Sequence, residues 1–246
     1  MNNSPPAQSL TLSVIIPCHN EEGSLEKVVN GLVEKLGREK IDYEIIIVDD
    51  HSTDRTASLA DELAERVKKI RVVHRTTQPS FGRAIRTGLD TAKGDVIIPF
   101  MGDASDEAED VAKFYHEMGK GYDVIYGSRF RKGTVVKDYP IVKLIINRIA
   151  NNFIRFLFFI KENDITNCFK AYRRYVIEKI KPIEATEFNI TVELPLKALA
   201  AGFNKKEVPV NWYGRDSGVS KHRLTILSKK YLSTVLKIWW RYRFRT

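Results

Sequence analysis

Five acidic side chains follow an apolar segment near the middle of the sequence. After VIIPFMG, residues 96–102, they stand at Asp103, Asp106, Glu107, Glu109 and Asp110. Clustered carboxylate oxygens are the ligands that a divalent cation requires. The same residues would also suit a solvated turn, because acidic side chains stabilise the first turn of the following helix. The cluster alone leaves a metal site and an ordinary turn both open.

Polar residues also follow three other apolar segments. They form PCHNEE at 17–22, DDHSTD at 49–54 and GSRFRKG at 127–133. Parallel strands bring their carboxyl ends to one edge of a sheet, where α/β proteins bind ligands. Three acidic ends and one basic end at such an edge favour a site that holds an anion through a metal and arginine side chains.

The elements that would position these residues alternate between strand and helix. Continuous apolar segments predict strands at 10–18, 43–50, 70–75, 94–101 and 122–129. Patterns typical of helices lie between them, at 21–36, 52–69, 82–93 and from about 109. This alternation predicts an α/β fold with a doubly wound, mostly parallel sheet.

Composition narrows the function classes. The chain has 246 residues, 43% of them hydrophobic, which suits one domain with a full core. A net charge of +9 favours an anionic partner, which could be a nucleic acid, a nucleotide or a membrane surface. Cys18 and Cys168 provide no disulfide framework and fit a reducing compartment. We expect neither a signal peptide nor a membrane-spanning helix.

Two common nucleotide signatures are missing from the sequence. No G-x-G-x-x-G follows the first strand, and no G-x-x-x-x-G-K-[ST] occurs anywhere. These motifs bind dinucleotides and nucleoside triphosphates. A dinucleotide oxidoreductase and a P-loop enzyme are therefore disfavoured.

The ordered motifs resemble those of family 2 inverting glycosyltransferases. The similar segments are SVIIPCHNEEGSLEKVV, YEIIIVDDHSTDRT, SFGRAIRTGLDTAKGD and FMGDASDEAED. Further along, YGSRF, DITNCFKAYRR and RDSGVSK resemble the polyprenyl-phosphate branch, typified by dolichyl-phosphate mannosyltransferase. The match runs from about Ser13 to Lys221.

This resemblance implies a fold, a reaction and a cellular location. The fold would be a Rossmann-like glycosyltransferase A-type domain, and the cofactor Mn²⁺ or Mg²⁺. The reaction would transfer a hexose, with inversion, from a nucleotide sugar such as GDP-mannose or UDP-glucose to a polyprenyl or dolichyl phosphate. The enzyme would be peripheral on the cytoplasmic face of a membrane, with no nucleic-acid partner, and it could form oligomers.

The resemblance also assigns roles to single residues. The positions that match nucleotide-sugar contacts are Pro17, His19, Glu21, Val48, Asp50, Gly102, Asp103 and Arg129. Asp103 matches the metal-binding aspartate, and Ser105 and Asp106 stand where they can also face the metal. Asp103, Arg215 and Lys221 match catalytic positions, the last two as the pair that meets phosphates.

The sequence departs from the family pattern at two of these places. Met101 stands where the family's D-x-D motif has its first aspartate, which leaves Asp106 or Glu107 as possible substitutes. His19 stands where the family often has tyrosine, so an imidazole would stack on the base.

The chemistry of the acceptor can be argued from charge. A phosphate monoester is largely dianionic at pH 7 and needs no general base, whereas an alcohol usually does. Arg215 and Lys221 therefore suit a phosphate acceptor better than a sugar hydroxyl. Asp164 could be a ligand or an ordinary loop residue, and Glu193 could line the acceptor site or make a buried polar contact.

Two segments have the pattern of interfacial helices. Within 140–161, one helical stripe carries the polar residues Asn147, Arg148, Asn151, Asn152 and Arg155. Within 223–245, one face carries Arg223, Lys230, Lys237 and Arg241, and the other Leu227, Tyr231, Val235, Ile238, Trp239 and Tyr242. The basic stripes predict binding to anionic lipid. In the alternative interpretation, both helices cover the core or a dimer contact.

These patterns divide the chain and leave alternative functions open. We expect a catalytic domain at 1–222, with a nucleotide-binding half at about 11–130 and an acceptor half at about 131–222, followed by an interfacial or juxtamembrane helix at 223–246. One alternative is transfer to a saccharide hydroxyl in cell-surface glycan synthesis. The other is a non-catalytic relative that binds nucleotide sugar or lipid.

Overall fold

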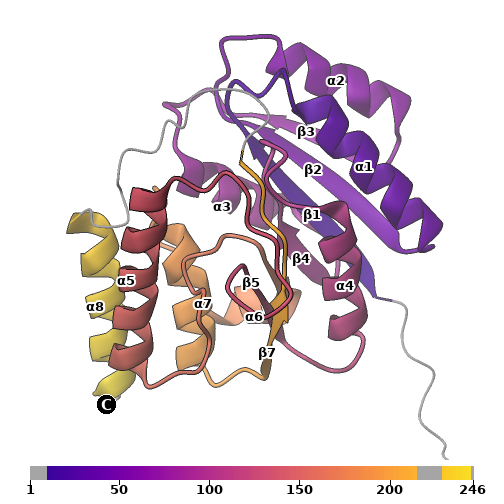
Figure 1. Ribbon diagram of the computed structural model, residues 1–246. Coiled ribbons are helices and arrows are strands. Elements are labelled where there is room, and N and C mark those ends of the chain that lie inside the picture. The colour runs from indigo at the N-terminus through magenta and orange to yellow at the C-terminus, as the bar shows by residue number, and fades with distance from the viewer. Residues whose placement is uncertain (1–9, 215–228, 245–246) are drawn as a thin grey trace, which may run out of the picture.

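A seven-stranded sheet organises the computed structural model, which describes residues 10–214 and 229–244 (Figure 1). The strands are β1 (Thr11–Cys18), β2 (Asp42–Asp49), β3 (Ile70–His74), β4 (Val96–Pro99), β5 (Val124–Ser128), β6 (Lys170–Arg173) and β7 (Lys205–Pro209). Their order is β3-β2-β1-β4-β6-β5-β7. Only β6 runs antiparallel to its neighbours, so β1, β2, β4 and β5 end at the same edge.

Helices cover both faces of this sheet. In chain order they are α1 (Leu25–Arg38), α2 (Thr56–Arg66), α3 (Phe81–Thr91), α4 (Ala108–Met118), α5 (Ile141–Phe158), α6 (Arg174–Lys179), α7 (Ile190–Ala200) and α8 (Lys229–Arg243). The first core cluster includes residues of α1, α2 and α4. The second includes residues of α3, α5, α6, α7 and α8.

Alternating side chains of the central strands serve the two cores. In β1, Val14 and Ile16 join the core under α1, whereas Ile15 joins the core under α3. In β2, Ile45 and Ile46 divide in the same way. Successive strand residues point to opposite faces, so a central strand covered on both sides must be apolar throughout. This is why β1 and β2 read as continuous apolar segments.

The five predicted strands and the mostly parallel α/β fold are confirmed, but two strands were missed. Strands β6 and β7 are short, and their sequences KAYR and KKEVP carry charged residues. The fully buried Lys170 lies in β6, where its ammonium group donates to the backbone oxygen of Ile165. A strand that buries a lysine on such a contact lacks the apolar alternation on which sequence prediction depends.

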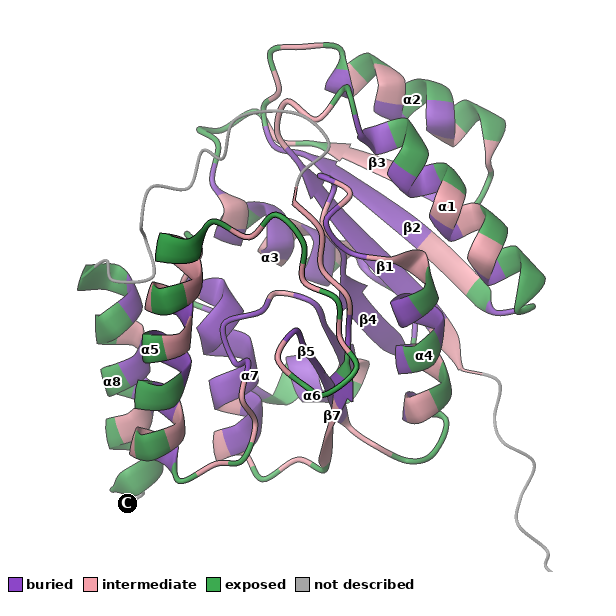
Figure 2. Ribbon diagram, in the orientation of Figure 1, coloured by how far each residue is buried: buried purple, intermediate pink, exposed green. Residues whose placement is uncertain are grey.

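The polar stripe predicted to face lipid on α5 instead faces largely inward. Asn147 and Asn151 are buried, whereas Ile141 is 71% and Phe156 75% exposed. Figure 2 shows the outer surface of α5 as mostly exposed. The assignment of this stripe to the membrane was wrong, because the two asparagines bond to the loop beneath the helix.

Helix α8 covers the core, as the alternative interpretation expected for its predicted apolar face. Tyr231, Val235 and Ile238 are buried in the core that contains α7. Lys237 on the opposite side pairs with Glu184 at 2.5 Å. Among the helices of residues 10–214 and 229–244, none is long and apolar enough to cross a membrane.

Candidate functional site

Hydrogen bonds tie the loops after β1 and β2 together. The backbone N–H of Asp50 donates to the carbonyl oxygen of Cys18 at 2.7 Å, and His19 Nδ1 lies 2.9 Å from the carbonyl oxygen of Asp50. The backbone N–H of Glu21 donates to Thr56 Oγ1 at 2.8 Å. Pro17 and Val48 are buried partners in the β1–β2 register. The structure therefore brings all five predicted nucleoside-contact positions of these two loops together.

The Asp50 carboxylate is held from two sides. Its Oδ1 accepts from Arg75 Nη1, and its Oδ2 accepts from the backbone N–H of Ser80 at 2.6 Å. Asp50 and Arg75 side chains are 5% and 8% exposed. A buried carboxylate with these partners is fixed in direction. Arg75 and Ser80 were not predicted, because they lie 25 and 30 residues downstream of Asp50, beyond α2 and β3.

The end of β4 approaches the end of β1 closely at Gly102. A Cβ added there would lie 3.0 Å from Cys18 Sγ and 3.3 Å from the carbonyl oxygen of Pro17. The carbonyl oxygen of Gly102 also accepts from Ser24 Oγ at 2.7 Å. An added side chain would force these neighbours to shift by a few tenths of an ångström, so the close approach favours glycine. This contact places the acidic segment beside the β1 loop.

The acidic segment itself is folded inward. Asp103, Ser105 and Asp106 are all buried, at 4%, 2% and 7% exposure. The backbone N–H of Ser105 donates to Asp103 Oδ1 at 3.2 Å, and the backbone N–H of Met101 lies 3.4 Å from Asp106 Oδ2. Burial, followed by the charge of Asp103, raises the pKa of Asp106 to about 7. A solvated turn would have left these carboxylates in water, so that interpretation is wrong for Asp103 and Asp106.

The chemistry of these side chains fits a divalent cation. Two buried carboxylates that repel each other supply hard oxygen donors, which Mg²⁺ and Mn²⁺ prefer. Within residues 10–214 and 229–244, no group of three or more His, Cys, Asp or Glu side chains is arranged to hold a metal. Such a cation would therefore need further oxygen ligands from a bound substrate. Glu107, the other candidate substitute for the missing aspartate, accepts from Asn211 Nδ2 at 2.9 Å instead.

A basic residue closes the end of β5. The Arg129 guanidinium forms a two-pronged ion pair with Asp164, with Nε to Oδ2 and Nη2 to Oδ1 both at 2.8 Å. Burial lowers the pKa of Arg129, but the charge and hydrogen bonds of Asp164 outweigh burial and raise it above its ordinary value. Asp164 thus proves to be the partner of a site arginine. This pairing was not predicted, because Asp164 lies 35 residues downstream of Arg129.

Glu193 makes a buried polar contact, one of the two roles left open for it. Its carboxylate accepts the backbone N–H groups of Glu184 and Ala185 at 2.9 and 2.5 Å, and it pairs with Lys197. These bonds fix the segment before α7. The predicted catalytic residues Arg215 and Lys221 lie outside the described residues.

A cavity of about 390 Å³ opens beside the acidic segment. Its lining includes Asp106 and Glu107 after β4, Lys27 on α1, and Tyr213 and Gly214. The cavity thus joins the segment after β4 to Tyr213 and Gly214, which follow β7.

A mostly parallel sheet with buried carboxylates at its strand ends, beside two linked loops, fits the glycosyltransferase A-type fold. The chain belongs to the family described as "Glycosyl transferase family 2", whose model matches residues 13–181. It is therefore a glycosyltransferase, as the motifs predicted.

Two relatives match most of the chain. Polyprenol monophosphomannose synthase of Mycolicibacterium smegmatis is 33% identical over 214 residues, which cover 85% of this chain and 79% of that protein. Dolichol-phosphate mannosyltransferase of Pyrococcus furiosus is 30% identical over 219 residues, which cover 86% of this chain. The matched region spans only 59% of the length of that second relative.

Solved structures with the same fold are more distant in sequence. Glucosyl-3-phosphoglycerate synthase from Mycobacterium tuberculosis, in complex with phosphoglyceric acid, gives a TM-score of 0.72 at 18% identity and covers 93% of this chain and 80% of its own. Its complex with Mn²⁺, uridine diphosphate and glucosyl-3-phosphoglycerate gives a TM-score of 0.71 at 18% identity, with 93% and 80% covered. At this identity the likeness establishes the fold alone.

Proposed function

We propose that this glycosyltransferase moves a hexose, with inversion, from a nucleotide sugar to a polyprenyl phosphate. The observation that carries the proposal is the buried Asp103–Asp106 pair, which the Gly102 contact seats beside the β1 loop that is bonded to Asp50. The names of the two relatives, a polyprenol monophosphomannose synthase and a dolichol-phosphate mannosyltransferase, support the lipid phosphate as acceptor.

The nucleotide sugar would lie across the ends of β1, β2 and β4. His19 would face the base, and Asp50, fixed by Arg75 and Ser80, would accept a hydrogen bond from a base N–H group. Pro17, Glu21 and Val48 would shape the same pocket. A carboxylate that accepts hydrogen bonds favours bases with an N–H at this edge, as in uracil and guanine.

A divalent cation, Mn²⁺ or Mg²⁺, would be held by Asp103 and Asp106, with Ser105 beside them. When bound, it would offset the charge that develops on the leaving diphosphate. The two aspartates themselves contribute fixed, desolvated oxygens at the edge where that diphosphate must lie. Mn²⁺ and Mg²⁺ complexes of the glucosyl-3-phosphoglycerate synthase support metal use within this fold.

Acceptor chemistry would use cations rather than a general base. A phosphate monoester carries its own charged oxygen, so attack on the sugar carbon needs no proton removal by the protein. Glu193, one carboxylate that a sugar-hydroxyl acceptor would need, is already engaged by two backbone N–H groups and Lys197. Arg129, Arg215 and Lys221 would bind the acceptor phosphate and the leaving diphosphate.

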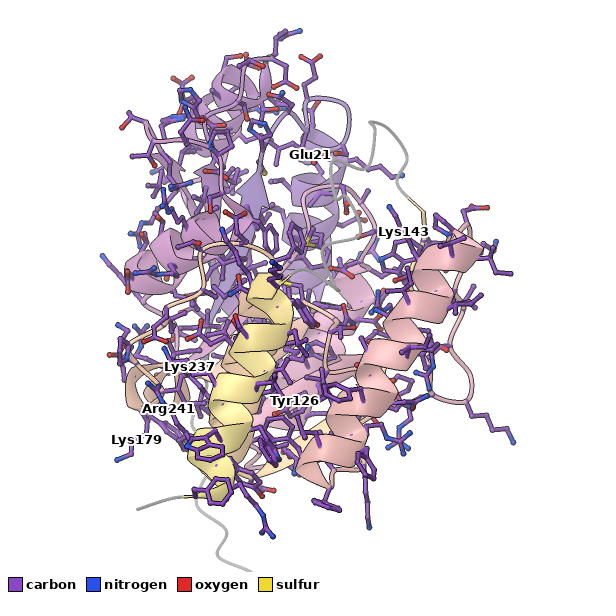
Figure 3. The ribbon with its side chains drawn as sticks, turned by 90° about the vertical axis from the view of Figure 1, so that its left-hand side faces the viewer. Glu21, Tyr126, Lys143, Lys179, Lys237 and Arg241 are labelled. Carbon is purple, nitrogen blue, oxygen red and sulfur yellow. The ribbon has the colours of Figure 1, made fainter. Side chains whose placement is uncertain are left out.

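The lipid acceptor would reach the enzyme at a membrane surface, to which α5 and α8 would bind by an apolar face. This face consists of exposed residues on α5 (Ile141, Val142, Ile145, Ile149, Phe153 and Phe156) and on α8 (Leu232, Leu236 and Trp240). The two helices are in contact, and Figure 3 shows them side by side, with Lys143, Lys237 and Arg241 labelled on them. Apolar side chains beside cations suit an anionic lipid surface.

A donor screen tests the proposed reaction. Purified protein is mixed with a short polyprenyl phosphate, Mn²⁺ and each of several GDP- and UDP-hexoses. The mass of the lipid product is then measured by mass spectrometry. We expect one hexose to be added with at least one donor. The Asp103→Asn variant should lose this transfer, whereas Glu107→Gln, from the same loop, should keep it. Transfer by Asp103→Asn at the wild-type rate would contradict the assignment of this residue.

A further inference from the structure

The buried Arg129–Asp164 pair is the end of a longer chain of hydrogen bonds that begins on α5. Thr166 Oγ1 lies at its centre and is 3.5 Å from Asp164 Oδ1. It accepts from Asn147 Nδ2 at 2.8 Å and from Asn151 Nδ2 at 2.9 Å. Asn151 Oδ1 in turn accepts the backbone N–H of Thr166 at 3.2 Å. We call Asn147, Asn151, Thr166 and Asp164 the asparagine network.

Every member of the asparagine network is removed from water. Exposure is 0% for Asn151, 1% for Asp164, 2% for Asn147 and 9% for Thr166. Buried amides and hydroxyls are costly unless their hydrogen bonds are made, so a fully bonded network admits one arrangement of its parts. Here that arrangement fixes α5 against the loop that carries Asp164.

The network keeps apolar side chains of α5 exposed, which costs hydrophobic stabilisation. By keeping its asparagines inward, α5 turns apolar residues such as Ile149 (60% exposed) and Phe156 (75% exposed) outward. A helix rotated to bury those side chains would gain hydrophobic stabilisation. The buried asparagines exclude that rotation, because it would leave Thr166 without these partners.

We infer that Thr166 is a positioning residue that acts on Arg129 through Asp164. With both amide groups directed at it, Thr166 Oγ1 has its proton left to donate toward Asp164 Oδ1. Asp164 then presents its two oxygens in one direction to the Arg129 fork and to the backbone N–H of Arg129 at 3.0 Å. The network thereby sets the direction of the buried Arg129 guanidinium at the β5 end of the site.

This inference rests on the proposed function, in which Arg129 meets substrate phosphates. Thr166→Val tests it, because valine keeps the shape and removes the hydroxyl. We expect kcat to fall about tenfold with little change in the KM of the nucleotide sugar. Thr166→Ser should restore kcat. Ile154→Val, a packing change in the same helix at a 1% exposed residue, is the control and should leave kcat within about twofold.

A double-mutant cycle separates positioning from general destabilisation. If Thr166 acts through Arg129, Thr166→Val should cost little in an Arg129→Lys background, which already lacks the two-pronged pair. An equal tenfold cost in both backgrounds would overturn the inference. So would a Thr166→Val enzyme as active as Thr166→Ser.

A spectroscopic measurement keeps the inference independent of the proposed reaction. In protein labelled with ¹⁵N-arginine, the Arg129 Nε–H resonance is identified by its loss in Arg129→Lys. Thr166→Val should shift this resonance, whereas Thr166→Ser should leave it near its wild-type position. An unchanged resonance in Thr166→Val would overturn the positioning role. A wild-type enzyme that transfers no sugar would contradict only the proposed function.

Discussion

The pKa of Lys170 shows how strongly the burial of a single residue near the site changes its protonation. Its side chain is completely buried in β6, and Nζ donates to the backbone oxygens of Ile165 and Asn167. Burial lowers its pKa from the ordinary 10.5 to about 8, although the charge of Asp164 acts in the opposite direction. Lys170 therefore holds the loop between Asp164 and β6, and its burial there lowers the pKa of its ammonium group.

The stability of the protein should depend on pH through this lysine. Below about pH 8, Lys170 is protonated in both the folded and the unfolded chain and adds no pH dependence. Between about 8 and 10.5, only the unfolded chain keeps the proton, so the free energy of unfolding should rise with pH. The rise should reach at most about 3 kcal/mol.

Lys170→Met provides the comparison for this prediction. The difference in unfolding free energy between wild type and variant, from denaturant titrations at pH 7 to 10.5, should change in favour of the wild type. Lys132→Met, at an exposed position, is the control. A wild-type-minus-Lys170→Met difference that stays flat over this range would show that the lysine is not desolvated as described.

At the scale of elements, α5 has the most unusual packing. Its length and polar stripe were predictable, because the spacing of Asn147, Asn151 and Arg155 is helical. The face of α5 that points inward was not predictable, because the rule that apolar residues face the core fails when buried asparagines have hydrogen-bond partners. Their loop partner, Thr166, lies on a segment whose position no local pattern reveals.

The apolar face of α5 should bind membranes even at high salt. Phe156→Ser combined with Ile149→Ser removes two exposed side chains that would enter lipid, worth together about 3 kcal/mol or roughly a hundredfold in partitioning. Vesicle sedimentation with anionic liposomes measures the loss. Because both residues are exposed, the fold should be unaffected, as circular dichroism can check.

Salt dependence and a control substitution distinguish insertion of apolar side chains from electrostatic attraction to the lipid. Attraction by basic stripes alone would be screened at high salt, whereas apolar insertion would persist. Val135→Ser, an apolar residue that is 40% exposed outside the two helices, is the control. If the double variant sediments with vesicles as well as wild type does, α5 is not the lipid-binding surface.

At the scale of the whole molecule, the regular half of the fold was the predictable half. From β1 to β5, buried parallel strands are continuous apolar segments, and their polar ends mark the site. This is how His19, Asp50 and Asp103 could be proposed together. Their partners could not be proposed, since Arg75, Ser80 and Asp164 reach the site only through the tertiary arrangement.

The same arrangement unites donor, acceptor and membrane in the proposed account. In this account the ends of β1, β2 and β4 would hold the donor, and β5 would bring Arg129 to the substrate phosphates. The asparagine network then connects Arg129 to α5, whose outer face is apolar. In this account the acceptor must carry a phosphate, because Asp103 and Asp106 are assigned to the cation and Glu193 is engaged by two backbone N–H groups and Lys197.

A comparison of acceptors tests that requirement most directly. The enzyme is given the same nucleotide sugar with either a polyprenyl phosphate or the matching polyprenol, in the same detergent, and the initial rates of transfer are measured. The account predicts transfer to the phosphate, with a rate that rises through about pH 6 as the acceptor becomes dianionic. Equal rates of transfer to the phosphate and to the free alcohol would contradict it.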